Sequence, residues 1–330
     1  MESKMGSFKL FITTIILVLS NLTYGLSAHL KSRIMENRNC AECNLQGADL
    51  SGLDLSFVNL EKANLKGAKL KKTNLKQANL KGANLTQANL IAADLSSADL
   101  SGANLQKAIL AKANLSDTAL NDVNARRAVL FGAIMNQTKL SGSSFEEANF
   151  KYVKLTEPLV YETNFRHANL SRMLFKNLDL SGSDFTGAII TGSLFKNCDL
   201  DEVNFTNANL EQSKFIRSQL KKAIFSNSNV RNSVFKKVDA SGSQFVNITG
   251  MGTSFEKVSL DGAIFLNTDF SLSYFDRTSL RKSKIQSSLF PESLMAQEDK
   301  TCGTKINAKR LKPCDASFAW DDGLDEIEAH

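Results

Sequence analysis

Large apolar side chains recur at every fifth position of this chain, and the phase never slips. The pattern runs from Leu45 and Leu50 to Ile285 and Phe290, which makes fifty five-residue cassettes over residues 43–292. We call the fifth-residue position the centre; the cassettes without a large apolar centre are those of Ala125, Ala240 and Gly250. Two residues before each centre the chain prefers a small residue, at a position that we call the minor site.

A period of five matches neither an α-helix nor a continuous strand. Within one cassette, the minor site and the centre are two residues apart, which puts both side chains on one face of a short strand. The other two residues must turn a corner. Thirteen of the eighteen glycines lie two residues after a centre, where a type II turn requires a positive φ. Each cassette therefore predicts a three-residue strand and a two-residue corner around an apolar axis.

The spacing of the phenylalanines predicts the number of sides of this coil. Between Phe165 and Phe275, phenylalanine centres alternate with smaller centres, so that phenylalanine returns every ten residues. In a four-sided coil of 20 residues, these rings stack on two opposite walls and fill the core evenly, whereas a three-sided coil would spread them. We expect four sides and about 12 coils, stacked at about 4.8 Å per coil.

The cassettes at residues 48–52 (ADLSG), 78–82 (ANLKG) and 98–102 (ADLSG) resemble those of the pentapeptide-repeat family. The resemblance implies an all-β fold, a right-handed quadrilateral parallel β-helix, over residues 43–292. It implies no particular activity, because members of a fold family can share a shape without sharing a function.

The N-terminus has the features of a secretory leader. Lys4 and Lys9 precede an apolar run of about ten residues, which is too short for a bilayer that requires about 20. We expect residues 1–28 to be a signal peptide, residues 29–42 to be an N-terminal cap, and the chain to be exported to a periplasmic, extracellular or lumenal compartment. No transmembrane segment is expected after signal removal; an uncleaved signal anchor is the alternative.

The cysteines fit an oxidising compartment. Cys40 falls on a centre and Cys43 on the next minor site, and a corner brings such positions close enough for a disulfide. A redox-active Cys-x-x-Cys is the alternative, but no βαβ pattern surrounds it. Cys302 and Cys314 predict a second disulfide in a C-terminal cap over residues 293–314, and Cys198, at a minor site, predicts a buried small side chain.

The net charge of +6 conceals a segregation. Residues 29–314 carry +11, whereas residues 315–330 form an acidic tail with six carboxylates and neither Lys nor Arg. A basic body favours anionic partners, although a solvated surface is the alternative. The chain has three histidines and none of the nucleophile, phosphate-loop or metal-ligand spacings that mark a catalytic site. We therefore predict no catalytic residues, no cofactor and no metal.

Once the sequence is folded onto a 20-residue coil, cations and apolar residues gather on one wall. We call this surface the basic wall; it consists of the outward residues around the centres that lie 20 residues apart, from 135 to 275. As a candidate interaction face it comprises Ile134, Lys154, Leu174, Lys176, Leu194, Lys196, Lys214, Arg217, Val234, Lys236, Lys237, Lys257, Tyr274 and Arg277. An apolar stripe edged by cations predicts a docking face for a protein or an anionic surface.

These features predict a non-enzymatic, exported, rod-shaped scaffold or interaction module. The family resemblance also implies an alternative, a nucleic-acid mimic that protects topoisomerases, but the basic body and the leader disfavour it. A second alternative is direct binding of anionic polymers or membranes through the basic wall. Nucleic acid is disfavoured because the wall lacks the regularly interleaved aromatics that bind single strands. The sequence leaves open whether two rods form a homodimer.

Overall fold

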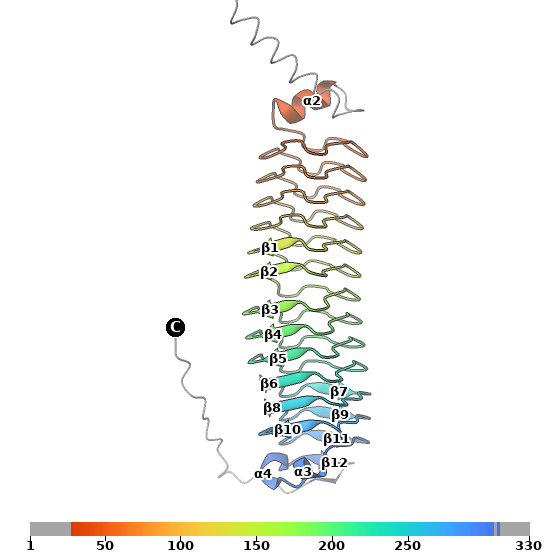
Figure 1. Cartoon of the computed structure of the whole chain (residues 1–330), viewed down its shortest axis with the longest axis vertical. Helices are drawn as coiled ribbons and strands as arrows, with labels where there is room; N and C mark the ends of the chain where they lie inside the picture. The colour runs from red at the N-terminus through yellow and green to blue at the C-terminus, as the bar shows by residue number, and fades with distance from the viewer. Residues whose placement is uncertain (1–27, 307–308, 311–330) are drawn as a thin grey trace, which may run out of the picture.

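The chain forms a rod of stacked coils (Figure 1). We describe it from a computed structural model that covers residues 28–306 and 309–310. Parallel bridges join most outward strand residues to the residue 20 positions further on, from Asn39 with Asn59 to Asp269 with Leu289. Four cassettes therefore complete one coil, and the fold is the expected right-handed quadrilateral parallel β-helix.

Regular strands occupy only part of the rod. The elements are α2 (Ala28–Met35), β1 (Ile134–Asn136), β2 (Lys154–Thr156), β3 (Leu174–Lys176), β4 (Leu194–Lys196), β5 (Lys214–Ile216), β6 (Val234–Asp239), β7 (Gln244–Val246), β8 (Ser254–Ser259), β9 (Ile264–Leu266), β10 (Tyr274–Asp276), β11 (Lys284–Gln286), α3 (Glu292–Met295), α4 (Glu298–Thr301), β12 (Lys305–Ile306) and β13 (Lys309–Arg310). Within the described residues, the coils before β1 are held by single bridges. Regular strands are thus present in fewer coils than the about 12 that we expected for the rod. In the other coils, the short strands and tight corners leave one bridged residue per side.

The core is a column of centre side chains along the rod axis. Phe175 and Phe195 stack with ring centroids 4.6 Å apart, and the facing column stacks in the same way, with 5.3 Å between the rings of Phe185 and Phe205. Across the axis, Phe185 and Phe195 meet edge to face at 6.4 Å. The predicted phenylalanine columns on opposite walls are confirmed, and both stacked and edge-to-face contacts are favourable for aromatic rings.

Almost every corner contains a residue in the left-handed backbone conformation, with a positive φ, whether or not that residue is glycine. Lys72 and Arg172, for example, both have a φ of 59°. The backbone N–H of Lys72 donates to the carbonyl of Ile91 in the next coil at 2.9 Å, and Arg172 donates to Thr191 in the same way. Stacking between coils therefore imposes a conformation that side chains other than glycine otherwise avoid, and the glycine pattern marked only some of the corners.

The hydrogen bond that closes a corner differs from one minor site to another. At alanine minor sites such as Ala103, the N–H donates to the preceding centre carbonyl over 2.8–3.1 Å, whereas at Leu53 and Val58 this distance is 3.3 Å. No such bond is present at Leu178 or Ile248 within the described chain. Among the described residues, the bond is also missing at the smaller residues Cys198 and Ser218, whereas Val153 keeps it at 3.0 Å, so the volume of the minor-site residue does not by itself set the corner.

Most buried hydroxyls at the minor site donate to a centre carbonyl, either of the coil before or of their own corner, as Ser228 does to Phe225. The hydroxyl of Ser193 donates to the carbonyl of Leu170 at 2.8 Å. Cys198 occupies the equivalent position and is buried, as predicted; its Sγ lies 3.5 Å from the carbonyl oxygen of Phe175. Burial raises the pKa of this thiol, so Cys198 behaves as a core residue.

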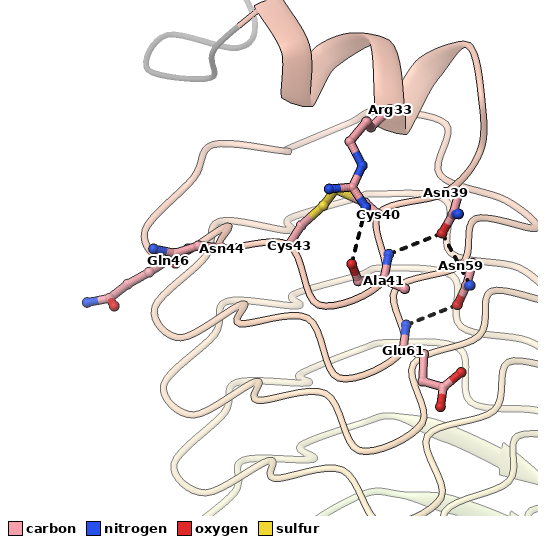
Figure 2. The surroundings of a disulfide bond; sticks show 9 residues. All are labelled: Arg33, Asn39, Cys40, Ala41, Cys43, Asn44, Gln46, Asn59 and Glu61. Carbon is pink, nitrogen blue, oxygen red and sulfur yellow. Dashed lines mark hydrogen bonds between the residues drawn. A yellow bond between two sulfur atoms is a disulfide. The ribbon is translucent and has the colours of Figure 1, made fainter.

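The N-terminal end is covered by α2 and closed by a disulfide (Figure 2). Ile34 of α2 is buried against the core. Cys40 and Cys43 form the predicted disulfide with 5.2 Å between their Cα atoms, and both cysteines are buried. Arg33 Nη2 reaches from α2 to donate to the carbonyl of Ala41 at 3.3 Å. The first corner is therefore cross-linked and tied to the helix above it.

The C-terminal end is covered by α3, α4 and β12 (Figure 1). Leu294 is buried against the core, β12 pairs in parallel with β11, and β13 pairs with β12 in the antiparallel direction. The antiparallel pairing of β13 ends the parallel stack. Together with the helices it covers the last coil, whose exposed strand edge could otherwise pair with another chain. Cys302 is disulfide-bonded, but Cys314 lies outside the described residues, so the predicted pairing stays a prediction. The predicted signal peptide over residues 1–28, apart from Ala28, and the acidic tail also lie outside them.

The backbone ladder is interrupted once along the basic wall. β1 and β2 form a two-stranded sheet, and β3 begins a separate six-stranded sheet that runs through β4, β5, β6 and β8 to β10. Figure 1 shows β2 and β3 further apart than the strands around them. Pro158 lies at the minor site of this coil, where it has no N–H for the corner bond. The phase nevertheless survives, because Glu162 N–H donates to the carbonyl of Ser181 at 3.1 Å.

Candidate interaction surface

The structure places the predicted interaction residues on one side of the rod. They lie on β1 to β6, β8 and β10 or at the corner that follows these strands. The register aligns Leu174 with Leu194 and Lys176 with Lys196, and the same 20-residue alignment continues to Tyr274 on β10. Every member of the set is exposed or half-buried, whereas the centre between them points inward.

The interruption after β2 divides the basic wall. Ile134 and Lys154 belong to the sheet of β1 and β2, while the other members belong to the continuous sheet from β3 to β10 or to its corners. The sequence pattern predicts one wall over centres 135–275. The structure narrows the continuous surface to β3–β10, because backbone pairing fails between β2 and β3.

Two ion pairs neutralise part of the wall. Lys236 Nζ lies 2.8 Å from Glu256 Oε2, and Arg277 Nη2 lies 2.7 Å from Asp276 Oδ2. The hydrogen bond from Arg277 lowers the pKa of Asp276, which stays ionised. For the other seven cations of the wall, no ion pair is present within the described residues. The wall therefore keeps an excess of positive charge.

Four cations stack in one line at the corner after the β3–β10 sheet. Arg217, Lys237, Lys257 and Arg277 follow one another at 20-residue intervals and are all exposed. We call this line the basic column. Side chains in successive coils are about 4.8 Å apart at the backbone, and like charges at that spacing repel. An anion along the column would relieve this repulsion.

An apolar group that the sequence analysis missed flanks the opposite corner of the wall. Phe131, Tyr152, Met251 and Leu272 are exposed there, and the rings of Phe131 and Tyr152 meet edge to face with centroids 5.3 Å apart. These residues stand one or two positions after centres of a single column. Comparing corner positions 20 residues apart would have found them. The wall thus lies between an apolar corner and the basic column.

The rest of the described surface does not assemble a catalytic or metal centre. It contains no group of three His, Cys, Asp or Glu residues able to hold a metal ion. The largest carboxylate shift belongs to Glu147, whose pKa falls from 4.5 to about 2 because Arg127 and Arg126 donate hydrogen bonds to it. This is a surface ion-pair cluster without an adjacent nucleophile. In the same described region, no helix is long and apolar enough to cross a membrane.

The fold and the surface define a class: a repeat solenoid that presents flat walls. Family models assign it further, because "Pentapeptide repeat region" matches residues 128–205 and 188–265, and "Pentapeptide repeats (8 copies)" matches residues 39–77, 68–106 and 108–146. The chain therefore belongs to the pentapeptide-repeat family. Proteins of this family are generally non-enzymatic structural or interaction proteins.

Solved structures of the same family are similar to this chain. HetL, a pentapeptide repeat protein involved in heterocyst differentiation regulation in the cyanobacterium Nostoc sp., is 22% identical over 72% of this chain and 95% of its own, with a TM-score of 0.31. Full-length QnrB1, a plasmid-mediated fluoroquinolone resistance protein, is 17% identical over 64% of this chain and 91% of its own, with a TM-score of 0.25. A thylakoid-lumen protein from Arabidopsis thaliana is 35% identical over 31% of this chain and 63% of its own, with a TM-score of 0.14.

A search of curated proteins found no match.

Proposed function

We propose that this chain is an exported, non-enzymatic rod that docks an acidic protein partner on the basic wall. The observation that carries the proposal is the combination of cations with exposed or half-buried Leu174 and Leu194 in one register. Apolar contacts supply most of the affinity of a protein interface, and complementary charge supplies orientation and association rate. A wall with both properties suits a protein surface better than a purely anionic polymer.

Export is supported by the leader pattern and by the disulfide at Cys40 and Cys43, because disulfides persist in oxidising compartments. Cell fractionation of the native host with N-terminal sequencing of the mature chain tests this part. A processed chain outside the cytosol is expected. Recovery of the full-length chain from the cytosol would contradict it.

The docking part is tested with a photoreactive amino acid at Leu194. A discrete adduct with an acidic protein is expected from extracts of the native compartment. The same probe at Ile189, an exposed apolar position on the neighbouring wall, should not form that adduct. Equal adducts at both positions would contradict docking on the basic wall.

Charge reversal gives a matched control for this experiment. The triple variant Lys176→Glu, Lys196→Glu and Lys214→Glu should lose the Leu194 adduct, because it reverses the charge of β3–β5. The same triple reversal at Lys66, Lys71 and Lys76, which are exposed on early coils, should retain it. If the first variant retains the adduct and instead loses retention on heparin, direct binding of anionic polymers replaces the proposal.

A further inference from the structure

The basic column lies in the last coils of the rod and has more cations than nearby acids. The acids beside it, Glu256 and Asp276, are already engaged with Lys236 and Arg277. Beyond the corner, Asp239 lies 3.6 Å from Lys221 Nζ. Arg217, Lys237 and Lys257 have no ion pair within the described residues. Three stacked cations are therefore available to an acidic segment.

Exposed apolar side chains lie across the same strands. Tyr274 of β10 is 62% exposed, and Leu272 and Met251 at the preceding corner are 69% and 43% exposed. Tyr274 is the first residue of β10, before the centre Phe275, and Arg277 directly follows the strand. A segment that crosses this strand can touch apolar side chains at one corner and cations at the other.

The chain itself carries a segment with the matching chemistry. Residues 315–330 have six acids and no Lys or Arg, and they include Phe318 and Trp320. In this segment two aromatic residues precede Asp321, Asp322 and Asp325. This order matches the surface of the rod, where an apolar corner lies beside the basic column, and the charges are opposite. This complementarity identifies an occupant without an external partner.

The length of the tail is sufficient. β13 ends at Arg310 beside the last coil, and the 20 residues that follow can extend about 65 Å at about 3.3 Å each. Opposite walls of a packed core are about 10 Å apart, and the column from Arg217 to Arg277 covers three coil steps, or about 15 Å. The path from Arg310 to the column is thus well within reach.

We propose that residues 315–330 dock in cis across the last coils of the rod. Phe318 and Trp320 cover Met251, Leu272 and Tyr274, and the acids that follow neutralise the basic column. A bound tail would compete with an acidic partner at the C-terminal part of the basic wall. That competition rests on the proposed function, whereas the docking of the tail does not.

Trp320 is the single tryptophan of the chain, so its emission reports the tail directly. In the full mature chain, we expect emission at shorter wavelength and weaker acrylamide quenching than in a peptide of residues 311–330. The triple variant Arg217→Glu, Lys237→Glu and Lys257→Glu should shift both signals to the peptide values. The reversal of Lys66, Lys71 and Lys76 should leave them unchanged, and circular dichroism checks that each variant keeps the fold.

A second variant tests the other partner of the contact. Asp321→Asn, Asp322→Asn and Asp325→Asn together should expose Trp320 as the column variant does, and 1 M salt should do so in part because it reduces the Debye length from about 10 Å to about 3 Å. Emission equal to that of the peptide in the unmodified chain would overturn the proposal. A blue shift that disappears on dilution would also overturn it, because the tail would then dock on a second copy. Both results are independent of the Leu194 adduct that tests the proposed function.

Discussion

The first coils and the last coils share one backbone register but differ in the side chains at their centres and minor sites. Up to Leu140, the centres are mostly leucine over alanine minor sites, and single bridges hold the walls together. From Phe145 onward, two columns of centres become phenylalanine, minor sites more often carry Ser, Thr or Val, and regular strands are common. The comparison shows that the five-residue period sets the coil in both regions, whereas regular strands are common only in the region with phenylalanine centres and fewer alanine minor sites.

The largest expected effect comes from emptying the aromatic core. Phe195 is fully buried and stacks on Phe175 and Phe215, at 4.6 Å and 4.8 Å between centroids. Phe195→Ala should lower the free energy of unfolding by about 4 kcal/mol, and Leu100→Ala in the early coils by about 3 kcal/mol, because a ring leaves the larger cavity.

Urea denaturation measures both losses, and Lys196→Ala is the surface control for the aromatic variant. Hydrogen exchange then locates the effect, because long repeat arrays do not always unfold in one step. A loss at Leu100 that equals or exceeds the loss at Phe195 would contradict the distinction between the two regions.

A smaller effect is expected where the aromatic core is adapted to a missing side chain. Gly250 occupies a centre, and a Cβ added there would lie 2.1 Å from Cε1 of Phe270. Gly250→Ala should therefore cost about 1–3 kcal/mol through overpacking. In a Phe270→Leu background, the same change should cost less, because the shorter side chain leaves room. Thermal melts of the double-mutant cycle measure the coupling; an equal cost in both backgrounds would contradict it.

The smallest effect is expected at the junction of the two regions. Glu147 accepts hydrogen bonds from Arg126 and Arg127 of the preceding coil, which lower its pKa from 4.5 to about 2. Because the folded pKa lies below the unfolded value, this contribution to stability is complete above about pH 4.5 and disappears as the pH falls towards 2.

The difference in melting temperature between the unmodified chain and Glu147→Gln should be small and constant from pH 5 to 8, and should shrink on acidification. Salt should reduce it, because the group is on the surface. Glu61→Gln, which removes a carboxylate without an ion pair in the described region, is the control. A difference that grows on acidification would contradict the assignment.

Much of the fold could be predicted because each coil repeats one local rule. Apolar centres, small minor sites and glycine corners led to four sides, opposite phenylalanine columns and the disulfide of Cys40 with Cys43, all of which are present. The left-handed conformation of Lys72 could not be predicted from its own preference, because hydrogen bonds from the next coil impose it. The loss of pairing between β2 and β3, in the coil that contains Pro158, could not be predicted either, because it depends on how two whole coils pack.

The sequence by itself determined the period, the coil and the side of the rod on which each residue of the basic wall lies. Alternation along a three-residue strand leaves no other choice of face once the centres are buried. Only the tertiary structure decided that Lys236 and Arg277 are paired while Arg217, Lys237 and Lys257 have no ion pair in the described region. The pair of Lys236 with Glu256 requires stacking, which brings residues 20 positions apart within reach, and the pair of Arg277 with its sequence neighbour Asp276 requires the conformation of the corner.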